Sequence, residues 1–224
     1  MQPLNDVRDV DTALDHIDWN DLHHAAPTLR HILRAIADNR RLLTDLVEGS
    51  RTTPRLFHRG EHHPVMSRLV LAEPDDRAWA LRLHVFHGAE RDLIPHTHKR
   101  PFGAHILAGG YLHAWQRRTD GQDAGPFTSH TLTPGIVALE TPGSDYLLGD
   151  PLIHQTIMEA GTVTLFASGP DRQPTWWAAT DMGGEVAQMK QDDIAGRDYS
   201  MTHAAHAAIA TTLTDLGLIE RTKP

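Results

Sequence analysis

The stretch IPHTHKRPFGAHILAGGY, residues 94–111, decides the fold that we expect. It contains two histidines, His96 and His98, separated by one residue. In an extended strand, alternate side chains point to the same face, with Cβ atoms roughly 6–7 Å apart. One metal ion can bridge two imidazoles at this spacing. The pair alone is weak evidence because the chain has 17 histidines, so its meaning depends on the sequence around it.

The composition is that of a globular protein that handles small molecules. The chain has 224 residues, 40% hydrophobic and 22% charged, with a mean hydropathy of −0.39. No apolar run approaches the ~20 residues of a membrane span. The polar, acidic start has no signal-peptide pattern, so we expect a cytoplasmic protein without a membrane partner. The absence of cysteine excludes disulfides and thiolate metal sites. The net charge of −8 argues against a nucleic-acid surface.

Residues 1–64 are predicted to form a helical extension that packs on the rest of the protein. A short helix over 11–17 is followed by a longer one that begins near Pro27 and ends at Gly49. Residues 51–64 read as a polar connector with solvent-exposed histidines. The longer helix has apolar residues at i, i+3, i+4 and i+7, which predicts one buried stripe formed by Leu29, Ile32, Leu33, Ile36, Leu43, Leu46 and Val47.

Residues 65–170 change to short β-rich runs bounded by glycine, proline and aspartate. About nine such runs without intervening helices predict a mainly β domain, an antiparallel sandwich or barrel. Residues 171–224 are expected to form a linker through Gly196 and a final helix that ends at Gly217. The expected strands are Val65–Ala72, Trp79–His87, Phe102–Leu107, Tyr111–Arg117, Ser129–Leu132, Ile136–Glu140, Tyr146–Leu148, His154–Met158 and Thr162–Ser168.

Two separated motifs resemble those of the cupin superfamily over roughly residues 66–170. In the first cupin motif a His-x-His pair is followed by a glutamate and then by a glycine. Here His96 and His98 are followed by Gly103, where the glutamate would stand, and by Gly110. The second motif runs from a glycine through a Pro-x-Gly turn to a third histidine.

The second motif is matched by Gly143, the turn Gly149–Pro151 and His154, with proline and glycine exchanged within the turn. Met158 stands where that motif ends in asparagine. The resemblance implies a cupin-type antiparallel β-barrel, or jelly roll, with flanking helices. It also implies that His96, His98 and His154 bind one divalent metal ion. Three imidazoles on one face of an ion leave positions open for a substrate or for dioxygen.

Several other residues are candidates for the site. His105 should point inward one layer beyond Gly103, as a fourth ligand, a hydrogen-bond partner of a ligand, a general base, or a core histidine. Tyr111, His113 and Trp115 share one face of the next strand, and either face could line the interior; we take His105, Tyr111 and His113 as candidate catalytic residues. For substrate binding the candidates are Arg82 and His84 on one strand face, where an arginine could bind a carboxylate, and Arg100 in the loop after the histidine pair.

Within the cupins, the chain most resembles the thiol dioxygenases, whose bacterial members also have a glycine in place of the glutamate, after an aromatic residue. Their Ser-His-Tyr relay would fall on Thr164, Phe166 and Ser168, so the relay is absent here. This departure argues against cysteine itself as the substrate.

Three functions are therefore compared. The first is an Fe(II)-dependent dioxygenase that acts on a small polar or amino-acid-like substrate, with dioxygen as the second substrate. The second is a lyase, isomerase or bond-forming enzyme that uses Zn, Ni or Mn as a Lewis acid. The third is a ligand-binding cupin without catalysis. The helical flanks could also form a homodimer interface, since open barrels have edges to cover.

Overall fold

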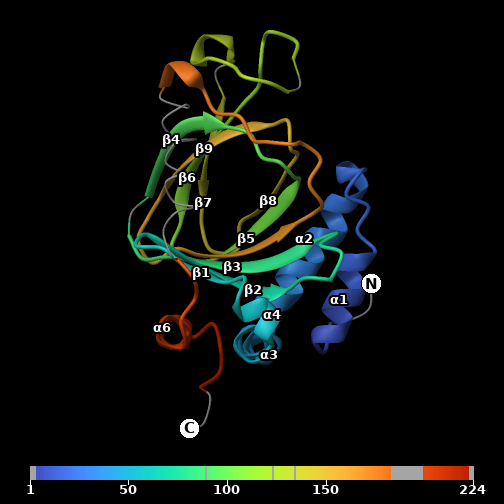
Figure 1. Ribbon diagram of the computed structural model, residues 1–224, viewed down its shortest axis with the longest axis vertical. Coiled ribbons are helices and arrows are strands. Elements are labelled where there is room, and N and C mark those ends of the chain that lie inside the picture. Colours follow the sequence, from blue (N-terminus) through green and yellow to red (C-terminus); the bar gives the residue numbers. More distant parts are fainter. Residues whose placement is uncertain (1–3, 89, 123, 134, 183–198, 222–224) are drawn as a thin grey trace.

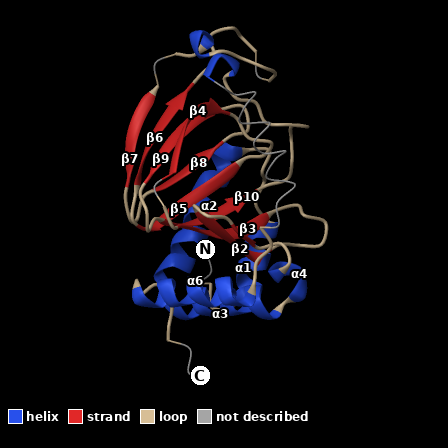
Figure 2. Ribbon diagram, turned by 60° about the vertical axis from the view of Figure 1, so that its left-hand side comes forward, coloured by secondary structure: helices blue, strands red, loops and turns tan. Residues whose placement is uncertain are grey.

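The computed structural model describes residues 4–88, 90–122, 124–133, 135–182 and 199–221. These residues form two antiparallel sheets that face each other, with the long helices gathered on one side (Figures 1 and 2). The helices are α1 (Val7–Asp15), α2 (Leu22–Asp38), α3 (Arg40–Thr52), α4 (Pro54–Phe57) and α6 (His203–Asp215), with short 3₁₀ helices η1 (Ser129–Thr131) and η2 (Thr180–Met182). The strands are β1 (Glu61–His62), β2 (Met66–Ala72), β3 (Ala80–Phe86), β4 (Glu90–His96), β5 (Phe102–Ala108), β6 (Tyr111–Gln116), β7 (Ile136–Glu140), β8 (Asp145–Leu148), β9 (Ile153–Met158) and β10 (Val163–Ser168).

The strands are distributed unequally between the two sheets. One sheet has six strands in the order β1-β2-β3-β10-β5-β8, and the other has four in the order β4-β9-β6-β7. Strands that are distant in the chain are therefore neighbours, as when β9 lies between β4 and β6. The architecture is mainly β, with two antiparallel sheets and helices at both the N-terminal and C-terminal ends, as the sequence predicts.

The two faces of the six-stranded sheet have different environments. Its inner face looks toward the four-stranded sheet and carries polar and aromatic residues. Its outer face packs under α2 and α3, and together they form the main hydrophobic core. Burial of this apolar surface is the principal contribution to the stability of the folded protein. That core includes Leu69, Leu71, Leu81, Leu83, Val85, Val163 and Leu165 of the sheet, together with Leu29, Leu33, Leu43 and Leu46 of the helices.

The N-terminal helical region differs from the expectation in its boundaries. The expected single stripe is divided between α2 and α3, because Asn39 ends the first helix and its side chain accepts a hydrogen bond from the Leu42 N–H (3.1 Å) at the start of the second. Pro27 lies inside α2 and not in its first turn, since Asp21 is the N-cap. Gly49 lies within α3, which continues to Thr52. The expectation that Pro27 begins a helix and that Gly49 ends it was therefore wrong.

The β region contains two further differences. Residues 129–132 were expected to be a strand but contain η1. The strand β4 was not expected, because its charged start, Glu90-Arg91-Asp92, lacks the apolar alternation of a half-buried strand. Much of the expected linker, residues 183–198, lies outside the described residues. Among the described residues, no helix combines the length and apolar composition needed to cross a bilayer.

Candidate metal centre and its cavity

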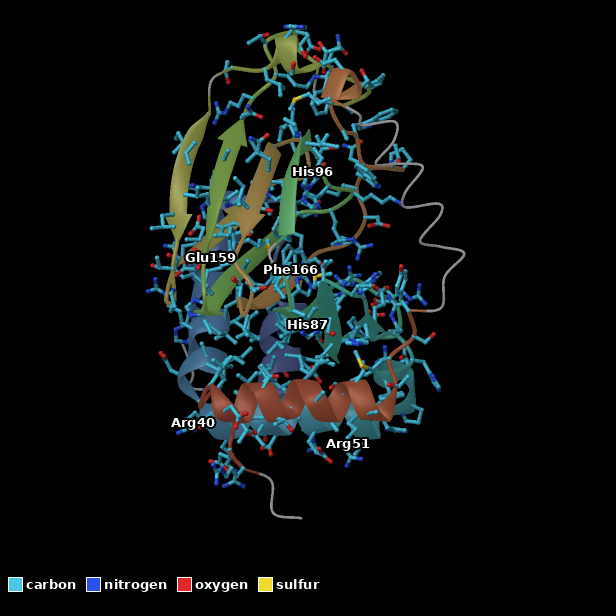
Figure 3. All side chains as sticks on the ribbon, turned by 90° about the vertical axis from the view of Figure 1, so that its left-hand side faces the viewer. Arg40, Arg51, His87, His96, Glu159 and Phe166 are labelled. Atoms are coloured by element: carbon cyan, nitrogen blue, oxygen red, sulfur yellow. The ribbon has the colours of Figure 1, made fainter. Side chains whose placement is uncertain are left out.

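The three predicted ligands come together between the two sheets. His96 ends β4 and is paired in register with His154 on β9, while His98 lies two residues beyond the end of β4. One ligand nitrogen from each of the three lies within 4.8 Å of the others. The Nε2 atoms of His98 and His154 are 2.6 Å apart. His96 lies on the four-stranded sheet and Phe166 on the six-stranded sheet, and both are labelled in Figure 3.

The protonation of the cluster suits a metal ion. The Nδ1 atom of His96 is 3.0 Å from the Ile94 carbonyl oxygen, so an Nδ1–H can donate there, and Nε2 is then the nitrogen that could bind a metal. Burial, reinforced by His96 and His113, lowers the pKa of His98 to about 3. Burial also lowers the pKa of His154 well below its usual value. Neutral imidazoles are the form that binds a divalent cation, and three of them suit Fe, Zn or Ni.

The position of the missing glutamate has a structural explanation. A Cβ atom on Gly103 would lie 2.7 Å from Cδ2 of Leu29, so this residue points away from the histidines and toward α2. The inward side chain of this strand is Phe102, whose ring centroid is 4.6 Å from that of His98 and 5.9 Å from that of His154. A phenyl ring therefore occupies the place beside the ligands that was assigned to residue 103, and that assignment was wrong by one residue.

Two connected hollows meet at the histidine cluster. The larger has a volume of about 930 Å³ and extends between the sheets toward β2 and β6. The smaller, about 700 Å³, reaches toward Lys99, Arg100 and Trp176. The residues that line both hollows are Arg59, Arg68, Arg82, His84, His96, His98 and Phe166.

Arg82 is the most notable cation of this cavity. Burial lowers its pKa to about 10, with help from Arg68 and Arg100, so the guanidinium stays charged at neutral pH. Its Nη1 atom donates to the Ser168 hydroxyl (3.2 Å), and no described carboxylate lies within ion-pair distance of it. Arg68, by contrast, is 3.4 Å from Glu61. Arg82 thus brings to the cavity a buried positive charge that no described carboxylate contacts directly.

The other predicted substrate-binding residues lie nearby in different settings. His84 lines the cavity beside Arg82, and burial together with Arg68 and Arg82 lowers its pKa well below 6.5, so its imidazole is neutral. Arg100 lines the smaller hollow and forms an ion pair with Asp171 at 2.5 Å. The charge of Arg100 is therefore already compensated.

His105 lies on the other side of the sheet. It pairs with Leu165 and Asp145, and the groups that act on its pKa are burial and then Asp145, Arg34 and Asp38, residues at the α2 side. It lines neither hollow. The expectation that it points inward was wrong, because Phe102 and Ala104 occupy the inward positions of β5.

The sequence did not decide whether the face of β6 with Tyr111, His113 and Trp115 points inward or outward, and in the structure it points inward. Tyr111 lines the larger hollow, and its hydroxyl donates to that of Tyr146 at 2.6 Å. His113 is completely buried and lines neither hollow. Its Nε2 atom is 2.8 Å from Nδ1 of His154, so it contacts the back of a ligand. Trp115 packs on His113, with ring centroids 4.9 Å apart.

Sequence reasoning missed two residues of this region, Tyr146 and Glu140. Burial raises the pKa of both, and Glu140 lies 3.4 Å from Nδ1 of His113. Glu140 ends β7 directly after an apolar run, a position that could have marked it as a buried carboxyl group. The positions of the absent relay, Thr164, Phe166 and Ser168, also face the interior.

Comparisons with known proteins give the following. No family model and no curated protein matches the chain. Among solved structures, an RmlC-like cupin from Shewanella frigidimarina is similar at 12% identity and a TM-score of 0.36, over 50% of this chain and 84% of that one. The hydroquinone 1,2-dioxygenase PnpCD, in complex with Cd²⁺ and 4-hydroxybenzonitrile, is similar at 10% identity and a TM-score of 0.36, over 58% and 73%. KdgF from Halomonas sp. is similar at 12% identity and a TM-score of 0.35, over 49% and 84%.

Proposed function

We propose that this protein is a metal-dependent, cupin-type enzyme, and specifically an Fe(II) dioxygenase that acts on a small anionic substrate such as an amino-acid-like carboxylate. One observation carries the proposal. Three histidines converge within 4.8 Å at the meeting point of two hollows, and both hollows are also lined by the guanidinium of Arg82, which has no described carboxylate within ion-pair distance. A protein that merely buried its histidines would not require an adjacent cavity or an uncompensated buried cation.

The donor set favours a metal that accepts nitrogen ligands. His96, His98 and His154 offer three imidazole nitrogens and no carboxylate, so the ligands leave the positive charge of a divalent ion uncancelled. Fe(II), when bound, would supply redox chemistry with dioxygen. The phenyl rings of Phe102 and Phe166, with centroids 4.6 Å apart, would exclude water from the reacting groups.

The rest of the cavity supports an anionic substrate. Arg82 would bind a carboxylate through two parallel hydrogen bonds, which is the geometry that guanidinium groups favour. The neutral His84 beside it could donate one further hydrogen bond. Because Tyr111 donates to Tyr146, the hydroxyl hydrogen of Tyr146 is the one left for a molecule in the larger hollow.

The test begins with elemental analysis of untagged protein, purified without added metal, beside His154→Ala. We expect close to one iron per chain in the parent, loss of most of it in the variant, and oxygen consumption by the iron-loaded parent with at least one small amino or hydroxy acid. A matched control is His62→Ala, which removes a histidine remote from the three ligands.

Each other outcome contradicts part of the proposal. Zinc or nickel at one per chain, with no oxygen consumption after iron reconstitution, would replace the dioxygenase with a lyase or isomerase. No metal in either protein, even after reconstitution, would overturn the metal site and leave a ligand-binding protein.

A further inference from the structure

A polar chain of three residues runs from the back of the metal site into the four-stranded sheet. His154 on β9, His113 on β6 and Glu140 on β7 lie on three adjacent strands. In the register, His154 is opposite Trp115 and Glu140 is opposite Tyr111, so each is diagonal to His113 on the same inner face. The exposed fractions of the three side chains are small, with residue values of 5%, 0% and 7%.

The distances define a direction along this chain. Nδ1 of His154 is 2.8 Å from Nε2 of His113, and Nδ1 of His113 is 3.4 Å from Oε1 of Glu140. The second contact is at ion-pair distance, and Nδ1 of His113 makes no hydrogen bond within the described part of the chain. On its other side, Nε2 of His154 faces the Nε2 atom of His98.

Only one arrangement of hydrogens makes His154 a metal ligand. For Nε2 of His154 to offer a lone pair, its hydrogen must be on Nδ1, where it donates to Nε2 of His113. The hydrogen of His113 must then be on Nδ1, which faces the carboxyl oxygen of Glu140. In the opposite arrangement His113 donates to His154, the hydrogen of His154 moves to Nε2, and that nitrogen cannot bind a metal.

We propose that Glu140 and His113 are positioning residues that hold His154 in its metal-binding tautomer and ring orientation. The Oε1 atom of Glu140 faces Nδ1 of His113, so a hydrogen on that nitrogen meets an acceptor, which favours the productive arrangement over the other. The ring of His113 is held by Trp115 and Tyr146, with centroids 4.9 and 4.6 Å away. Packing on both neighbours restricts rotation of the imidazole, so the hydrogen bond to His154 has a fixed direction.

This inference rests on the metal-binding part of the proposed function and not on the reaction. The test is therefore a titration of metal-free protein with Zn²⁺, and with Co²⁺ to record the visible spectrum. His113→Phe retains an aromatic ring without an acceptor, and His113→Gln restores one. Glu140→Leu removes the terminal oxygen. His105→Phe is the matched control, because His105 is a buried histidine on the opposite face of β5.

We expect His113→Phe to weaken metal binding about 10- to 100-fold, the usual effect of losing a hydrogen-bond partner of a ligand. His113→Gln should recover part of the affinity and of the Co²⁺ spectrum. Glu140→Leu should weaken binding less. The double variant His113→Phe with Glu140→Leu should bind as His113→Phe does, because Glu140 acts through His113.

Two results would overturn the inference while leaving the metal site intact. One is a folded His113→Phe variant with the parent's affinity and Co²⁺ spectrum. The other is a double variant whose loss is the sum of the single losses. Failure of the parent to bind either metal would instead overturn the proposed function. If His113→Phe does not fold, Glu140→Leu decides: unchanged affinity and spectrum overturn the inference, and weaker binding supports it.

Discussion

The two sheets face the same cavity but differ in what lies behind them. The six-stranded sheet has α2 and α3 on its outer face, and Leu81, Leu83 and Leu165 there are completely buried. The four-stranded sheet carries His96 and His154, two of the three proposed metal ligands, and in the described part of the chain no helix packs on its outer face (Figure 2). Its strand β7 leaves apolar residues open to solvent, among them Ile136 (73% exposed), Val137 (66%) and Leu139 (65%).

This difference indicates a division of roles. The helix-covered sheet holds the fold together and presents Arg82 and His84 to the cavity. The exposed sheet orders the histidine cluster through polar contacts across its strands. Changes behind the first sheet should therefore affect stability, and changes within the second should affect metal binding.

The largest expected effect on stability comes from the helix layer. Leu29→Ala removes a side chain that is 2% exposed and should cost about 2–5 kcal/mol of the free energy of unfolding. Leu139→Ala, the same change on the exposed sheet, should cost about 0.5 kcal/mol or less. Denaturant unfolding of the two metal-free variants measures both values. Similar losses in the two would remove the distinction between the sheets.

The next effect concerns the buried cation. Arg82→Met should lower the affinity of metal-free protein for a small carboxylate about 10- to 100-fold, as expected for loss of about 1.5–3 kcal/mol of charged hydrogen bonds. Its unfolding free energy should stay level or rise, because an unpaired buried charge is removed. Calorimetry with a panel of amino acids measures the first value. A large loss of stability with unchanged affinity would instead make Arg82 a structural residue.

A smaller effect is expected where the metal-site strand meets the helices. Gly103→Ala places a methyl group against Leu29 and should cost about 1–3 kcal/mol by overpacking, without changing metal affinity. The combination with Leu29→Ala should cost less than the sum of the two, since the new methyl group enters the vacated space. Denaturant unfolding and Zn²⁺ titration of the parent, the two single variants and the double variant measure the stability and the metal affinity of each. Reduced metal affinity in Gly103→Ala would show that residue 103 contributes to the metal site.

The smallest effect is a pH dependence from the helix layer. Burial lowers the pKa of His206, whose Nε2 atom is 2.9 Å from the Ser50 hydroxyl. The folded protein therefore keeps this histidine neutral where the unfolded chain, with a pKa near 6.5, takes up a proton. Stability should be complete above pH 6.5 and fall below it, by up to about 1.4 kcal/mol per pH unit.

The control for this pH effect is His206→Gln in metal-loaded protein, in which the ligand histidines do not titrate freely. Between pH 7.5 and 5.5 the parent should lose more stability than the variant, as measured by melting temperature. Identical pH profiles would show that His206 does not contribute.

The sequence predicted the parts of this protein that local patterns encode. Alternation of side chains and turn residues identified eight of the strands, and the two motifs identified His96, His98 and His154. The motifs could not decide whether residue 102 or residue 103 points inward. Which side chains of β5 face the interior depends on its pairing with β10, which the motifs do not encode. Glu140 could not be predicted, since it reaches His154 only through His113 and across three strands.

The neighbouring pair Phe102 and Gly103 determines how this cavity could be redesigned or could have diverged. A carboxylate introduced at residue 103 would meet Leu29 and disturb the helix layer before it reached a metal. The same carboxylate at residue 102 would start from a position already beside His98 and His154. A substitution at residue 102 could therefore place an anionic group beside the three proposed histidine ligands, whereas the same substitution at residue 103 could not.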